Sequence, residues 1–301
     1  MTQVLPVDRR GTARSSAKPT RRRPPRHRRW TTGRVTVLVL VTAHVLVVLF
    51  PFVWMLYSSL KTQSQFIESV WSLPTSLNFS AYQEAWSGGE LATYAQNSAL
   101  VTGGSVLLTV FAATVAGYAA AVYRPRWLPP VEIGLLLGLA IPAYVALIPL
   151  VLMMRDLGLL DSRLGLILPT AAFNVPVSVF IMRAFFATLP HELLESARMD
   201  GCSEVSAFLR ITLPLAKPAM FTTAIINAIW VWNDFLFPLV FINDPLKQTL
   251  AVGLTNFQGE HVTEYPVLLA AIVMSALATF AIYAVFQRQV VGGLTGGAMK
   301  Q

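Results

Sequence analysis

Six long apolar segments constrain the fold of this chain more than any other feature. They cover residues 35–60, 97–123, 131–154, 164–189, 218–242 and 266–287. About 20 consecutive apolar residues allow an α-helix to cross a bilayer, where each backbone polar group must find its partner within the protein. Only 13% of the 301 residues are charged, which is about half of the usual fraction in soluble proteins. The sequence therefore predicts an all-α integral membrane protein with six transmembrane helices.

The composition of individual segments adds detail. The span 97–123 is rich in Ala, Gly, Ser and Thr, which predicts close packing inside the helix bundle. Pro142 is expected to kink the span 131–154 or to leave a carbonyl free. The polar stretch 61–96 is expected to form an external loop with one short helix near residues 80–86, and residues 243–265 a second external loop.

Basic residues are concentrated at one end of the chain. Eleven of the 23 Lys and Arg residues precede the first apolar span, so residues 1–33 are predicted to be a disordered tail and residues 34–301 the transmembrane domain. The span 35–60 is too long for a cleaved signal and is expected to be retained. Attraction of the tail to anionic lipid is favoured over nucleic-acid binding, so the expected partner is membrane lipid and not nucleic acid.

The same charges predict an orientation. With the N-terminus inside, the inner segments hold 19 of the 23 basic residues and the outer segments hold four. Cytoplasmic loops carry an excess of Lys and Arg. The chain is therefore expected to be a multi-pass protein of the cytoplasmic membrane with both termini on the cytoplasmic side.

The sequence shows no catalytic constellation. His191-Glu192-Leu193-Leu194-Glu195 begins like a zinc motif but lacks the second histidine, and no Gly-rich phosphate-binding loop is present. The single cysteine, Cys202, excludes an internal disulfide and a cysteine-based metal cluster. The chain is therefore not expected to be an enzyme, nor to bind a metal or cofactor of its own.

A charged insert, residues 190–217, separates the fourth and fifth spans. Acidic residues such as Glu195 suit the first turn of a helix, Gly201 permits a left-handed turn, and Ser203 can cap a second short helix. Pro214 is expected to end that helix. The pattern predicts a helix–turn–helix along the membrane surface that meets water or another protein.

Three groups of residues in this insert resemble the EAA motif of ABC importer permeases. The groups are Glu195-Ser196-Ala197, Asp200-Gly201 and Ile211-x-Leu213-Pro214, with Ser196 in place of the central alanine. The exit from the first span, Ser59-Leu60-Lys61, the start of the second, Asn97-Ser98, and the Gly-rich tail are similar to those of the maltose-type carbohydrate permeases. The resemblance covers residues 35–301 and leaves the basic tail unmatched.

The resemblance implies a role for the insert. In this family it is the coupling helix, which sits in a cleft of a separate ATPase subunit that holds ATP and magnesium. The residues expected at this contact are Glu195, Ala197, Met199, Asp200, Gly201, Phe208, Ile211, Leu213 and Pro214, with Met199 and Phe208 as apolar anchors. The implied partners are a second permease in a heterodimer, an ABC ATPase dimer and an extracytoplasmic sugar-binding protein.

Polar residues within the spans are the candidates for a substrate pathway. They are Asn174, Asn227, Trp230, Asn233 and Asp234. Amides and carboxylates are costly in hydrocarbon and are expected to face a cavity or another helix; amides and aromatic rings such as Trp230 and the nearby Trp232 suit the hydroxyls and apolar faces of a sugar. The alternative is structural, in which Asn233 and Asp234 hold helices together and Asn174 satisfies kinked backbone.

Two other functions were weighed against an ABC importer. An ion-coupled secondary transporter favours carboxylates at mid-depth and an internal repeat, but Glu132 and Asp234 both lie near span ends and no repeat is evident. A membrane-embedded enzyme needs a nucleophile or a metal pair. The favoured interpretation is a permease subunit of an ATP-driven ABC importer for a sugar, namely an oligosaccharide.

Overall fold

The computed structural model describes residues 32–123, 126–258 and 263–296. The chain divides into two units, residues 1–49 and residues 50–301. Helix α1 (Thr32–Ser58) begins in the first unit and ends in the second. In the first unit its apolar side chains are exposed on all sides, as in a helix surrounded by lipid.

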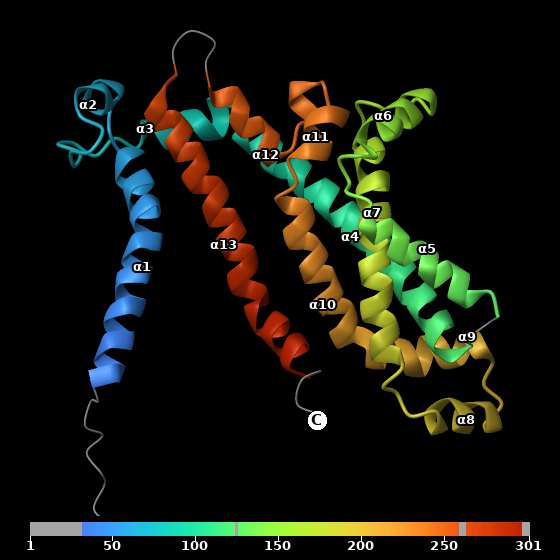
Figure 1. Cartoon of the computed structure of the whole chain (residues 1–301). Coiled ribbons are helices and arrows are strands. Elements are labelled where there is room, and N and C mark those ends of the chain that lie inside the picture. The colour runs from blue at the N-terminus through green and yellow to red at the C-terminus, as the bar shows by residue number, and fades with distance from the viewer. Residues whose placement is uncertain (1–31, 124–125, 259–262, 297–301) are drawn as a thin grey trace, which may run out of the picture. The chain divides into compact units, whose positions relative to one another are not determined.

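The regular secondary structure described in the second unit is all helical, with no β-strand among its described residues. Figure 1 shows that α8 and α9 lie at one end of its helices and that α11 and α12 lie toward the other. The elements that follow α1 are α2 (Gln63–Glu68), α3 (Ser80–Gln83), the π-helix η1 (Glu84–Gly88), α4 (Leu91–Val122), α5 (Leu128–Ala140), α6 (Leu147–Asp156), α7 (Arg163–Phe186), α8 (Glu192–Met199), α9 (Glu204–Ala207), the π-helix η2 (Phe208–Thr212), α10 (Leu213–Trp232), α11 (Leu236–Phe241), the 3-10 helix η3 (Pro245–Lys247), α12 (Leu250–Gly253), the 3-10 helix η4 (Leu254–Phe257) and α13 (Tyr265–Gly296). The predicted all-α class is confirmed.

Within the described residues, four helices are long and apolar enough to cross a membrane. They are Val35–Ser58, Leu91–Val122, Arg163–Phe186 and Tyr265–Ala284. The other two expected spans are each divided between two helices, 131–154 between α5 and α6 and 218–242 between α10 and α11.

The two breaks have different local causes. Between α5 and α6, Ile141 is extended, with φ −84° and ψ 115°, because a residue before proline is disfavoured in the helical region and Pro142 has no N–H to donate. The expected kink is thus a complete interruption. Between α10 and α11, the carboxylate of Asp234 accepts the N–H of Leu236, the first residue of α11, at 3.1 Å.

The most extensive packing between two described helices joins α4 and α7. A Cβ atom added to Gly117 would lie 2.8 Å from the backbone nitrogen of Arg183 and 2.8 Å from the Cβ of Met182. One added to Gly104 would lie 2.8 Å from Cδ1 of Ile167. Small residues in α4 therefore permit a distance between backbones that larger side chains exclude, which confirms the expected close packing of this span.

Asn97 anchors the loop after α11 to the bundle. Its Nδ2 donates to the carbonyls of Leu246 and Gln248 at 2.8 and 2.9 Å, and its Oδ1 accepts from Nε and Nη2 of Arg163 at 3.1 and 2.8 Å. Ser98 adds a bond, since its hydroxyl accepts the N–H of Leu250 at 2.8 Å. The buried pair at the start of the second span thus fixes a distant loop to α4 and α7.

Asp161 fixes the same loop to the turn before α7. This residue has a positive φ of 59°, and its Oδ1 accepts the N–H groups of Asn243 and Asp244 at 2.9 and 3.0 Å. The bond from Asp244, then that from Asn243 and the charge of Lys247, hold the pKa of the Asp161 carboxyl below its usual range. The carboxylate is thus stabilised in its charged form.

Residues 61–96 contain more structure than the sequence predicted. The expected helix near residues 80–86 is present as α3 and η1, and α2 was not predicted. Lys61 lies in the core, where its Nζ donates to the carbonyls of Ser69 and Val70 at 3.0 and 2.9 Å. Burial lowers the pKa of this lysine.

Candidate functional sites

The charged insert forms the predicted helix–turn–helix. Helix α8 ends at Met199, and Gly201, two residues later, has a φ of +79°. The N–H of Gly201 bonds the carbonyl of Arg198, and the N–H of Cys202 bonds that of Ala197, each at 3.0 Å. This is a Schellman motif, which needs a left-handed residue at the position of the glycine. The hydroxyl of Ser203 then accepts the N–H of Ser206 at 3.3 Å, so the predicted turn and cap are both confirmed.

Pro214 does not end the second helix, contrary to the prediction. Helix α9 continues through η2 into α10, and Pro214 lies in the first turn of α10. A proline has no N–H to continue the helical bonding pattern, so the pattern must change at this point. The π-turn before it bonds the N–H of Leu213 to the carbonyl of Phe208, so the bonding pattern changes where the proline would interrupt it.

One face of α8 is open to a partner. Glu195, Met199 and Asp200 are exposed, with Met199 at 88%, whereas Ala197 is buried at 3%. The Glu195 carboxylate makes no hydrogen bond or ion pair with the described residues. An unpaired acid beside an exposed methionine is suited to contact with a basic and apolar surface.

The end of the insert turns toward the bundle. The ring centroid of Phe208 lies 4.6 Å from that of Tyr118 on α4, within the core cluster that α4 forms with α7 and α10. Ile211 and Leu213 are half-buried, and Pro214 is exposed. Of the two expected apolar anchors, only Met199 presents its side chain outward, since Phe208 fastens the insert to α4.

A polar network that the sequence does not indicate connects α8, α9 and the end of α4. Nε and Nη2 of Arg198 lie 2.7 and 3.2 Å from Oε1 and Oε2 of Glu204, and the hydroxyl of Tyr123 donates to Oε2 at 2.8 Å. Hydrogen bonds from Arg198 and then Tyr123 lower the pKa of the Glu204 carboxyl. Tyr123 is 81 residues from Glu204 in sequence, so no local pattern could have indicated this contact.

A cleft of about 620 Å³ lies at the break between α10 and α11. Four of the five residues predicted for the substrate pathway line it, namely Asn174, Trp230, Asn233 and Asp234. Trp230 is 72% exposed. Phe173, Phe235 and Phe237 were missed, although the first two directly adjoin Asn174 and Asp234 in sequence. The break thus gathers amides, one carboxylate and several rings around one hollow.

Asn227, the fifth predicted pathway residue, lies elsewhere. It is buried, and its Nδ2 donates to the hydroxyl of Ser178 at 2.9 Å and to the carbonyl of Thr223 at 2.8 Å. This side chain joins α10 to α7, which is the structural alternative for a polar group in a span. The amide of Asn174 also bonds backbone, since its Nδ2 donates to the carbonyl of Thr170. Pro176 has no N–H and therefore leaves a different carbonyl, that of Ala172, without its helical donor. Asn174 thus does not satisfy the carbonyl that this proline frees.

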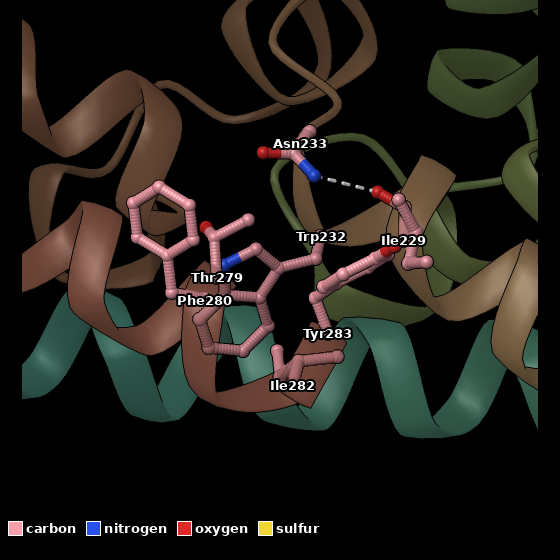
Figure 2. A pocket seen from close by; sticks show the side chains of 7 residues that line it. All are labelled: Ile229, Trp232, Asn233, Thr279, Phe280, Ile282 and Tyr283. Carbon is pink, nitrogen blue, oxygen red and sulfur yellow. Dashed lines mark hydrogen bonds between the residues drawn. The ribbon is translucent and has the colours of Figure 1, made fainter. Parts of the chain in front are cut away.

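A second, apolar cavity of about 310 Å³ lies between α10 and α13. Figure 2 shows its lining residues, which are Ile229, Trp232, Asn233, Thr279, Phe280, Ile282 and Tyr283. The amide nitrogen of Asn233 donates to the carbonyl of Ile229 at 2.8 Å. Trp232 lines this cavity and Trp230 lines the larger cleft, so the two tryptophans face different hollows.

Comparisons with known proteins identify the family. Residues 112–291 match the family described as binding-protein-dependent transport system inner membrane component. The chain is 32% identical to the probable ABC transporter permease protein YurM of Bacillus subtilis, over 91% of each chain. It is also 32% identical to the diacetylchitobiose uptake system permease protein NgcG of Streptomyces coelicolor, over 84% of this chain and 85% of that one.

A solved structure is also similar to this chain in sequence and fold. It is a bacterial ABC transporter involved in the import of the acidic polysaccharide alginate, with 26% identity and a TM-score of 0.76 over 86% of this chain and 98% of that chain. The resemblance to ABC importer permeases of the carbohydrate type is thereby confirmed, and the chain belongs to the family of binding-protein-dependent transport system inner membrane components.

Proposed function

We propose that this chain is a permease subunit of an ATP-driven importer that carries an oligosaccharide across the cytoplasmic membrane. The observation that carries the proposal is the exposed acidic face of α8 in a chain that belongs to the ABC permease family. Relatives are named for uptake of diacetylchitobiose and arabinooligosaccharides. The rings and amides around the larger cleft suit such molecules.

In this function, several subunits have separate roles. Glu195, Met199 and Asp200 contact an ABC ATPase dimer that holds ATP and magnesium, and a second permease completes the pathway as a heterodimer. An extracytoplasmic binding protein delivers the sugar, in agreement with the description of the family. The excess of basic residues in alternate loops supports cytoplasmic termini and a cytoplasmic position for α8.

Transport by reconstituted complex tests this function against the ion-coupled alternative. The transporter is purified with its partner subunits, placed in liposomes and supplied with sugar-loaded binding protein. Sugar uptake is expected with ATP and no ion gradient, and no uptake with an ion gradient and no ATP. Uptake driven by the gradient alone would contradict the proposal.

The larger cleft is proposed as part of the sugar pathway, with Trp230 as a stacking surface. In Trp230→Ala the maximal uptake rate is expected to fall about tenfold, equivalent to about 1.4 kcal/mol, because the exposed ring that lines the cleft is lost. The sugar concentration at half-maximal uptake should stay constant, since the binding protein sets capture. Trp230→Phe, which keeps a ring, is the matched control; an unchanged maximal rate in Trp230→Ala would exclude this role.

A further inference from the structure

Helix α8 has few means of holding a fixed angle to the bundle. It has eight residues and is followed by a turn in which Gly201 adopts a left-handed conformation. Its neighbour in space is the short helix α9, at the end of the bundle (Figure 1). A helix of this length is marginal alone, and a glycine gives its backbone more freedom than any other residue. A push on α8 therefore moves the bundle only if other contacts prevent rotation at this turn.

The network around Glu204 supplies such contacts from three elements. Arg198 lies on α8, Glu204 begins α9, and Tyr123 follows the last residue of α4. Both oxygens of the Glu204 carboxylate are used, with one bonded to Nε of Arg198 and the other to Nη2 of Arg198 and the hydroxyl of Tyr123. A two-pronged contact between guanidinium and carboxylate fixes orientation as well as distance.

The exposure of this network indicates that its effect is on position. The side chains of Arg198 and Glu204 are 44% and 45% exposed, and ion pairs at this exposure contribute little to global stability. Phe208 already holds the other end of the insert against Tyr118 of α4. The ion pair adds a second attachment, because Arg198 precedes the turn at Gly201 and Glu204 follows it. This attachment restricts rotation of α8 about the turn.

We propose that Glu204 is a positioning residue for coupling. Through Arg198 and Tyr123 it fixes the angle between α8 and α4, so that a displacement of α8 is transmitted to α4 and, through the close contact at Gly117, to α7. The inference rests on the proposed function, because it assumes that an ATPase displaces α8. It adds that transmission depends on an ion pair inside this chain, distinct from the residues that contact the ATPase.

The ratio of sugar imported to ATP hydrolysed tests the proposal in the reconstituted transporter. In Glu204→Ala this ratio is expected to fall about fivefold or more, while the ATPase still co-purifies because Glu195 and Met199 are intact. Arg198→Glu should give a similar loss. The double variant Arg198→Glu with Glu204→Arg rebuilds the ion pair in reverse, and the Tyr123 hydroxyl can accept from the new arginine. Its ratio is expected to return to within about twofold of the original.

The charge-swapped variant decides between this role and direct contact with the ATPase. If it is as poor as the single variants, the two side chains act on the partner and the proposal is overturned. An unchanged ratio in Glu204→Ala overturns it as well. Absence of ATP-dependent uptake in the unmodified transporter would instead refute the proposed function, so the two failures are distinguishable.

Discussion

Glu195→Lys is expected to abolish most sugar uptake and to release the ATPase from the purified transporter. The carboxylate of Glu195 is exposed on α8 and unpaired within the described residues, so a partner's basic group is its expected counterpart. Loss of one member of a buried, hydrogen-bonded charge pair costs about 2–5 kcal/mol, and placing like charges together adds repulsion. A loss of roughly 30-fold or more in ATPase affinity is therefore expected.

Two measurements check this expectation. The first is co-purification of the ATPase with tagged permease, and the second is ATP-dependent uptake. Ser196→Ala is the matched control on the same helix, because the Ser196 hydroxyl bonds only the carbonyl of Leu193 at 3.1 Å in the described structure and alanine is the usual residue in the resembling motif. Equal attachment in Glu195→Lys and Ser196→Ala would contradict the assigned role of Glu195.

The parts of the coupling segment that could be predicted depend on local chemistry. Gly201 was expected in a left-handed turn and Ser203 at a cap, and both are found there because each requirement involves only neighbouring residues. Pro214 was misplaced for a related reason. A proline is compatible both with the end of a helix and with a first helical turn. The π-turn that precedes Pro214 decides between these two possibilities, and the sequence does not indicate it.

The features that could not be predicted depend on contacts between distant residues. The span 218–242 reads as one apolar helix, and its division after Trp232 depends on the bond from the Leu236 N–H to Asp234 in place of a continued helical ladder. Likewise, Asn97 stands out in the sequence only through the family resemblance, whereas its amide bonds the carbonyls of residues 149 and 151 positions away. Periodicity identifies a buried face but not its partner.

Composition identifies the polar residues within the spans but does not tell which of them line the cleft. Polar residues within spans were expected near a cavity or another helix, and the structure contains both outcomes. Asn174 and Asp234 line the cleft, whereas Asn227 bonds Ser178 between helices. A polar residue in a span lines the cleft if it faces the break between α10 and α11, and bonds another helix if it faces that helix. The sequence does not indicate where this break lies.

Gly117→Ala is expected to destabilise the permease, whereas Gly103→Ala on the same helix should not. At Gly117 an added methyl would lie 2.8 Å from the backbone nitrogen of Arg183 and must push α4 and α7 apart; overpacking of this kind costs about 1–3 kcal/mol. At Gly103 no atom lies within 4 Å of an added Cβ, so alanine should stabilise the helix by about 0.5–1 kcal/mol.

Thermal unfolding of the two variants in the same detergent measures this difference in stability. We also expect a difference in the coupling of ATP hydrolysis to sugar import. Tyr118, which follows Gly117, contacts Phe208 at the base of the coupling segment. Displacement of α4 at Gly117 therefore shifts the surface on which that segment rests, so Gly117→Ala should also import less sugar per ATP hydrolysed. Equal unfolding temperatures for the two variants would show that α4 and α7 are not in close contact here, and coupling would then need a route other than this helix pair.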